Sequence, residues 1–244
     1  MDKILKICLG LLTIILVAFG GLLTYTAYTE ITYRNTLEGT YTYTCTITTD
    51  APLYNVTLFI PVPVDPAGNS PMVSRFSNRM MNGVPADWET ILFDTGKSTL
   101  LKITTPAIPV PEGTTTSHPY IITFSSETAS RTPVETRDPA GTGVMFRPPQ
   151  DLREYGCPAA RDDGSSRCFT YNASAFADYS TSADTFVTIT SAVDGKNTWT
   201  VFEPQSNEYH TDISIGMKGE NHGWVVPEGT LSSGTGTYDI PAGA

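Results

Sequence analysis

The chain has 244 residues, enough for one large or two small β-domains with a hydrophobic core behind an N-terminal segment of about thirty residues. Charged residues make up only 16%, and 25 acidic against 15 basic side chains give a formal net charge of −10. Because an acidic surface repels phosphate backbones, this composition argues against nucleic acid as a partner.

The first predicted element is a transmembrane helix. The chain is almost wholly apolar from Ile7 to Leu23, and this length of helix crosses most of a hydrocarbon layer of about 30 Å. Lys3 and Lys6 precede the run, so the positive-inside bias places the N-terminus in the cytoplasm. We therefore expect residues 1–29 to form a cytoplasmic start plus a membrane anchor, and residues 30–244 to be extracytoplasmic.

A cleaved signal peptide is the alternative, since a basic start followed by an apolar run describes both. Two features favour an uncleaved, single-pass anchor in the lipid bilayer. The run is longer than a usual signal-peptide core, and its best small-x-small site, Ala18-Phe19-Gly20, lies inside it.

Beyond the anchor, period-2 alternation predicts strands rich in Thr, Val, Ile and Tyr. The expected strands are 39–49, 54–62, 88–93, 98–105, 120–125, 185–193, 198–203, 208–217 and 236–240. Asp194-Gly195 lies between two alternating runs and predicts a hairpin turn. The expected fold is mainly β, with an Ig-like or larger antiparallel β-sandwich behind one N-terminal transmembrane helix.

One segment interrupts this pattern. Residues 132–164 are rich in Pro, Gly, Arg and Asp and show little alternation. The segment either divides the exported part into two lobes or forms a long excursion from one sandwich. We favour one continuous domain, because neither half alone has enough apolar strands to form a core of its own.

The exported cysteines are predicted to include one disulfide bond. Cys157 and Cys168 flank a loop rich in Ala, Asp, Gly and Ser, and export makes a bridge between them possible. Cys45 lies in an alternating strand on the same face as Tyr43 and Ile47, so it is expected to point into the core. An intermolecular disulfide at Cys45 is the alternative.

Two glycosylation sequons follow the anchor. They are Asn55-Val56-Thr57 and Asn172-Ala173-Ser174, and both are expected to meet a glycosylation machinery on the non-cytoplasmic side. Asn55 is expected on the solvent face of its strand, opposite the apolar residues.

No catalytic set is predicted. Asp94-Thr95-Gly96 looks like an aspartic-protease signature, but that chemistry needs two such motifs, and the triplet is good turn chemistry between strands. The three histidines do not stand at metal-ligand spacing, and Arg161-Asp162-Asp163 offers too few alternating oxygens for calcium. We therefore expect no enzymatic activity, no metal and no cofactor.

Short aromatic and glycine motifs recur in the C-terminal third: Gly195-x-Asn197-x-Trp199, Asn207-Glu208-Tyr209, Gly223-Trp224 and Gly236-Thr237-Tyr238. Together with residues 54–63, they resemble a pattern in archaeal membrane-anchored proteins without assigned function. The motifs cover about a quarter of the chain. The resemblance implies an exported β-domain behind an anchor and carries over no catalytic residue.

Three functional hypotheses follow. The first is a non-enzymatic cell-surface protein with a structural, adhesive or assembly role, whose partners are other cell-surface proteins or glycans. The alternative is a carbohydrate- or ligand-binding module that uses exposed tryptophan or the loop at 158–167; burial of Trp88, Trp199 and Trp224 would exclude the tryptophan version. An exported hydrolase is disfavoured, because no acid–base pair can be located.

Overall fold

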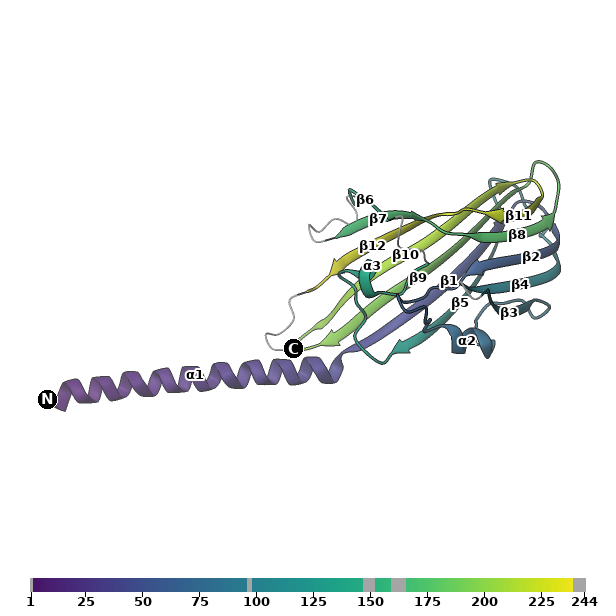
Figure 1. Cartoon of the computed structure of the whole chain (residues 1–244). Coiled ribbons are helices and arrows are strands. Elements are labelled where there is room, and N and C mark those ends of the chain that lie inside the picture. The colour runs from purple at the N-terminus through teal and green to yellow at the C-terminus, as the bar shows by residue number, and fades with distance from the viewer. Residues whose placement is uncertain (1, 96–97, 147–151, 159–165, 239–244) are drawn as a thin grey trace.

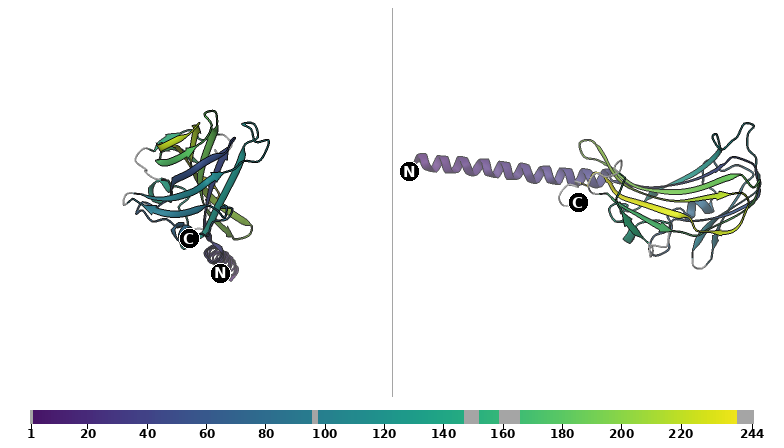
Figure 2. Two further views of the ribbon diagram at one scale, coloured as in Figure 1. Left: turned by 90° about the vertical axis from the view of Figure 1, so that its right-hand side faces the viewer. Right: turned by 90° about the horizontal axis from the view of Figure 1, so that it is seen from above.

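The N-terminal element is a single long helix, α1 (Asp2–Thr36). The computed structural model describes residues 2–95, 98–146, 152–158 and 166–238 (Figure 1). Helix α1 projects from one end of the remaining chain, and its apolar side chains are exposed over most of its length (Figure 2). Within its segment Leu5–Thr36, an 18-residue stretch reaches a mean hydropathy of 2.5, so the helix is long and apolar enough to cross a membrane.

The rest of the described chain is an antiparallel two-sheet sandwich, as the alternation predicted. Sheet A has seven strands in the order β5 (Tyr120–Ser130), β1 (Glu38–Thr49), β9 (Phe186–Thr200), β10 (Pro204–Lys218), β12 (Glu228–Gly236), β7 (Arg167–Asn172) and β6 (Arg153–Tyr155). Sheet B has five strands in the order β11 (Asn221–Val225), β8 (Ala175–Ser180), β2 (Leu53–Pro61), β4 (Thr99–Ile108) and β3 (Glu89–Asp94). Immunoglobulin sandwiches have about seven to nine strands, so this is the larger of the expected sandwiches.

Alternation in β1 shows how the core forms. Tyr43, Cys45 and Ile47 are buried against the second sheet, while the threonines between them lie on the outer face. Burial raises the pKa of the Cys45 thiol to about 12, so Cys45 is an unreactive small core residue, as predicted. Residues on both sides of the 132–164 segment, and Val134 and Phe146 within it, belong to one hydrophobic core.

Two chain segments join the sheets at one corner of the sandwich. β7 in sheet A leads to β8 in sheet B through two residues, and β11 in sheet B leads to β12 in sheet A in the same way. The backbone N–H of Ala173 donates to the carbonyl of Pro227 at 3.1 Å where the two segments cross. Strands that change sheets are a normal way to close such a corner.

Two short helices lie between the strands: α2 (Val73–Ser77) and α3 (Pro139–Thr142). Phe76 of α2 is buried and packs edge-on against Tyr43, with ring centroids 5.0 Å apart. The loop segments that hold these helices therefore fill part of the interior that the sheets alone leave open.

The hairpin predicted at Asp194-Gly195 was wrong. β9 continues straight through both residues, and the turn to β10 falls at residues 201–203. Gly195 lies opposite Tyr209 in the neighbouring strand, and the Tyr209 ring covers it so closely that a Cβ there would lie 2.1 Å from Cε1. The glycine therefore makes room for a ring inside a strand and does not form a turn.

Candidate functional site

Four aromatic side chains form a continuous strip on the outer face of sheet B. We call Phe59, Phe93, Phe176 and Trp224 the aromatic strip; they come from β2, β3, β8 and β11. Ring centroids are 5.4 Å apart for Phe93 and Phe59, 5.5 Å for Phe59 and Phe176, and 5.6 Å for Phe176 and Trp224. All three contacts are edge-to-face, a favourable geometry for aromatic pairs.

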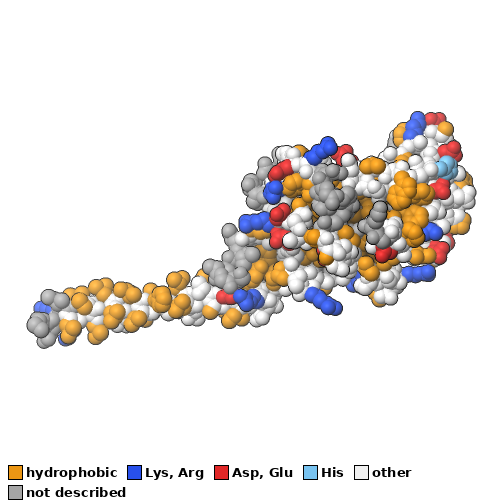
Figure 3. Space-filling view, viewed as in Figure 1, with side chains coloured by type: hydrophobic (Ala, Val, Ile, Leu, Met, Phe, Trp, Pro, Cys, Tyr) orange, Lys and Arg blue, Asp and Glu red, His pale blue; other side chains and the backbone are white. Residues whose placement is uncertain are grey.

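The ends of the aromatic strip are the most exposed. Trp224 is 63% exposed and Phe93 is 47% exposed, while the two rings between them are half-buried. Lys102 lies opposite Phe59 on β4, with its ammonium 5.9 Å from the ring centroid, and exposed Ile91 lies opposite Lys102 on β3. Figure 3 shows hydrophobic side chains gathered over the strands of sheet B.

The tryptophans divide clearly. Trp88, just before β3, and Trp199, on β9, are buried, whereas Trp224 stands out from edge strand β11. The condition that would have excluded tryptophan-based binding is therefore not met, because one of the three is on the surface.

A polar row runs beside the aromatic strip. Thr57, Asp178 and His222 lie opposite one another on β2, β8 and β11, two residues along each strand from Phe59, Phe176 and Trp224 and therefore on the same face. Nδ1 of His222 lies 2.6 Å from Oδ1 of Asp178, and its Nε2 lies 3.7 Å from Glu220. An apolar strip with a hydrogen-bonding border has the composition of a binding surface.

The hydrogen bond that the His222 ring donates to Asp178 is the main cause that raises the pKa of His222 above its ordinary value of 6.5, and the negative charges of Asp178 and Glu220 act in the same direction. We expect Asp178→Asn to lower this pKa towards the ordinary value, as followed by NMR titration of the His222 ring. Because the pKa of His222 is higher in the folded protein, its contact with Asp178 makes its full contribution to stability below about pH 6.5. This contribution is lost as the pH rises through the pKa of the folded protein. His118 serves as an internal control, and an unchanged His222 titration in D178N would exclude Asp178 as the cause.

The disulfide bond joins Cys157 to Cys168, the pairing expected from the sequence. It ties the residues that follow β6 to β7 at one edge of sheet A. Most of the loop between the two cysteines, including Arg161, Asp162 and Asp163, lies outside the described residues, as do Gly96 and Lys97.

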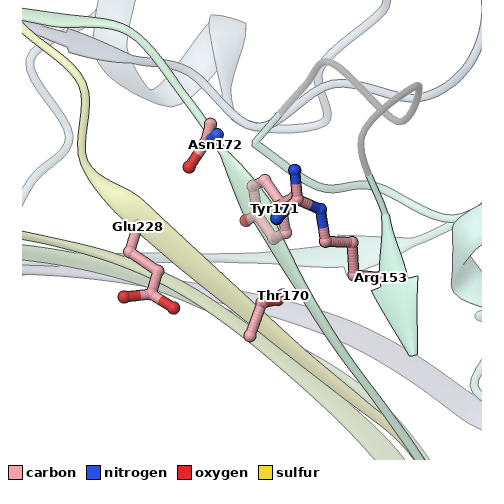
Figure 4. Close-up of a pocket in the computed structure, with 5 residues that line it drawn as sticks. All are labelled: Arg153, Thr170, Tyr171, Asn172 and Glu228. Carbon is pink, nitrogen blue, oxygen red and sulfur yellow. The ribbon is translucent and has the colours of Figure 1, made fainter. Parts of the chain in front are cut away.

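Both sequon asparagines have exposed side chains. Asn55 lies at an irregularity in β2, with φ of +54°, on the outer face of sheet B. Asn172 ends β7 and lines a shallow depression with Arg153, Thr170, Tyr171 and Glu228. Figure 4 shows Arg153 and Glu228 on opposite sides of β7. Glycosylation at either asparagine remains a prediction.

The candidate catalytic residues take structural positions. Asp94 ends β3, and the turn to β4 is held by Thr95, whose hydroxyl donates to the carbonyl of Ser98 at 2.9 Å. His210 lies on the polar outer face of sheet A between two carboxylates: Nδ1 is 2.7 Å from Asp194 and Nε2 is 3.7 Å from Asp212. In the described part of the chain, no group of three His, Cys, Asp or Glu residues is placed to hold a metal ion.

Three of the four motifs in the C-terminal third, those around Asn197, Asn207 and Thr237, meet at the end of the sandwich next to α1, whereas Gly223-Trp224 lies on β11 of sheet B. Asn197 and Asn207 are buried and lie opposite each other on β9 and β10. Asn197 Oδ1 accepts from the Val134 N–H, and its Nδ2 donates to the Val134 carbonyl, both at 2.8 Å, and to Asn207 Oδ1 at 2.9 Å. Asn207 also binds the Thr136 hydroxyl and the Thr237 carbonyl, so the pair fastens two loop segments to sheet A.

No protein-family model, curated protein sequence or solved structure matches the chain.

Proposed function

We propose that the protein is a membrane-anchored, non-enzymatic cell-surface protein that holds a partner on the aromatic strip. Its role is adhesive or one of assembly, and α1 keeps the binding domain at the membrane. The observation that carries the proposal is the row of four contacting rings on the solvent side of sheet B, which ends in a tryptophan that is 63% exposed.

Exposed contiguous aromatic surface is uncommon on a protein that works alone, because it costs free energy in water. At protein interfaces, Trp and other aromatic side chains contribute a large share of the binding energy, and polar groups surround them. The aromatic strip with Lys102 and the Asp178–His222 pair has this arrangement.

An extracytoplasmic location of the sandwich is part of the proposal. Lys3 and Lys6 precede the apolar run of α1, which favours a cytoplasmic N-terminus. The Cys157–Cys168 disulfide is the kind of bond that persists in an oxidising compartment, and both sequon asparagines are accessible to modification.

The geometry of the rings favours a protein partner. Neighbouring planes are inclined by 72°, 82° and 72°, so the rings form an uneven ridge that a complementary side-chain surface can fit. A flat platform, which suits sugar rings better, would need several parallel and exposed faces.

The proposal is tested with the full chain in detergent or lipid, using the double variant F93A/W224A. Chemical crosslinking in intact membranes identifies the neighbour, and its affinity is then measured with purified proteins. We expect binding to weaken at least tenfold, about 1.4 kcal/mol, with an unchanged unfolding midpoint, because both side chains are exposed.

The matched control is Phe186→Ala, which removes an aromatic side chain that is 49% exposed on β9, away from the aromatic strip. F186A is expected to bind like the unmodified protein. Equal loss in F186A and F93A/W224A, or full binding by F93A/W224A, would contradict the assignment of the aromatic strip.

A carbohydrate ligand is the second candidate, because one observation favours it. Trp224 and His222 lie two residues apart on the same face of β11, so a sugar stacked on the indole would meet a hydrogen-bonding group on the same edge strand. A glycan-binding screen with Trp224→Ala and Trp224→Phe separates the candidates. Glycan binding that is lost in W224A and retained in W224F would favour the module over the protein-binding role.

A further inference from the structure

The hairpin between β9 and β10 lies against the C-terminal turns of α1 (Figure 1). The hydroxyl of Thr36 donates to the Thr200 carbonyl at 2.9 Å and accepts from the Thr200 N–H at 3.0 Å. Three residues earlier on the helix, the Tyr33 ring packs edge-on against Trp199, with centroids 5.6 Å apart. The helix and the hairpin are therefore joined by polar and aromatic contacts.

The tip of the same hairpin reaches further back along α1. Phe202 stacks on Tyr25 with ring centroids 6.0 Å apart and lies 6.4 Å from Tyr28. Between Tyr25 and Thr36 the helix rises by about 16 Å at 1.5 Å per residue. The hairpin tip thus extends along three turns of the helix, in the direction of its apolar segment.

Phe202 remains open to its surroundings in spite of these contacts. Its side chain is 68% exposed, and Tyr25 and Tyr28 are 56% and 55% exposed. The three rings form one exposed aromatic group, made from two parts of the chain that are more than 170 residues apart in the sequence. A large apolar side chain at the tip of a turn is costly in water and favourable at the boundary of a bilayer.

The position of this group along α1 indicates what covers it. The continuous apolar run ends at Leu23, and Tyr25 and Tyr28 follow where an interfacial aromatic belt is found on transmembrane helices. Since Phe202 contacts both tyrosine rings, it lies at their depth. A spanning α1 therefore carries Phe202 to the boundary between headgroups and hydrocarbon.

We propose that the β9–β10 hairpin tip is a second membrane contact, with Phe202 inserted into the interface of the bilayer that α1 spans. The occupant of this surface is lipid. The contact rests on the proposed membrane anchoring, and it adds that the sandwich is docked on the bilayer surface at a defined place and does not stand clear of it.

Depth-dependent quenching of tryptophan fluorescence tests the contact. Full-length protein is reconstituted into phosphatidylcholine vesicles with acyl chains brominated at the positions nearest the headgroup. Phe202→Trp keeps an aromatic ring at the tip and adds one fluorophore to the native set. We expect about half of the added emission to be lost in brominated vesicles, relative to unbrominated ones.

Two further variants make the outcome decisive. Val17→Trp, in the middle of α1, reports whether the helix is in the bilayer, and Tyr54→Trp, at the start of β2, reports on the end of the sandwich away from α1. V17W is measured in vesicles brominated near the chain ends, at the depth of Val17, and we expect it to be quenched there; we expect no quenching beyond the native level in Y54W.

Quenching in V17W without quenching in F202W would overturn the hairpin contact and leave the anchor intact. Absence of quenching in V17W would overturn both, because the depth of Phe202 follows from that of α1. Equal quenching in Y54W and F202W would also overturn the proposal, since it would mean that the whole sandwich associates with lipid without a preferred tip.

Discussion

Replacing Asn197 with leucine is expected to lower the free energy of unfolding by about 2–6 kcal/mol, because two buried backbone groups lose their partners at about 1–3 kcal/mol each. Those groups are the N–H and the carbonyl of Val134, which both bond the Asn197 amide at 2.8 Å. The leucine side chain fills a similar volume, so the loss reports hydrogen bonding more than packing. Urea unfolding of the full chain in detergent, followed by tryptophan fluorescence, measures it.

Thr198→Ala is the matched control for Asn197, since Thr198 is the next residue on β9 and its side chain is exposed. Its effect is expected to stay within about 0.5 kcal/mol. Amide hydrogen exchange should also show faster exchange of the Val134 N–H in N197L than in T198A. An N197L protein as stable as T198A would contradict a structural role for the asparagine pair.

The second large effect is expected at Gly195. Gly195→Ala would place a Cβ 2.1 Å from Tyr209 Cε1, and the Tyr209 hydroxyl donates to the Val144 carbonyl at 2.6 Å, so the ring cannot move without losing that bond. Overpacking of about 1–3 kcal/mol and a lost buried hydrogen bond together give about 3 kcal/mol of destabilisation. Urea unfolding measures the loss.

Gly216→Ala is the control, because Gly216 lies on β10 with open space where a Cβ would be. It is expected to leave stability within about 0.5 kcal/mol. A double-mutant cycle adds a sharper test: once Tyr209 is alanine, at a cost of about 3–5 kcal/mol, G195A should add little further loss. Additive losses in G195A/Y209A would show that the two residues act independently.

The part of the fold that was predictable from sequence rests on alternation. In β1 and β2 one face is apolar over the whole strand, and side-chain alternation leaves little freedom to place such strands otherwise. β9 shows where the same reasoning failed. Asp194-Gly195 has the chemistry of a turn, but a ring from another strand occupies the space above the glycine, and no local pattern reveals that contact.

The aromatic strip was largely beyond prediction, for a different reason. Phe59 stands on the polar face of a strand whose other face is apolar, and that is the signal that could have marked it. Its neighbours Phe176 and Trp224 come from β8 and β11, which were not among the predicted strands. The contacts between these rings depend on the order of the strands in sheet B, and the residues of one strand do not reveal which strands lie beside it.

The junction after α1 limits where this protein can act. Helix α1 ends at Thr36 and β1 begins at Glu38, so Leu37 is the single residue between the helix and the sandwich. Such a short connection lets the sandwich rotate about the helix axis but allows little change in its distance from the end of the helix. With α1 in a bilayer, the domain would stay close to the membrane surface and within a short radius of the helix. It could engage neighbours in the same membrane, or polymers lying on it, while targets farther away would have to approach.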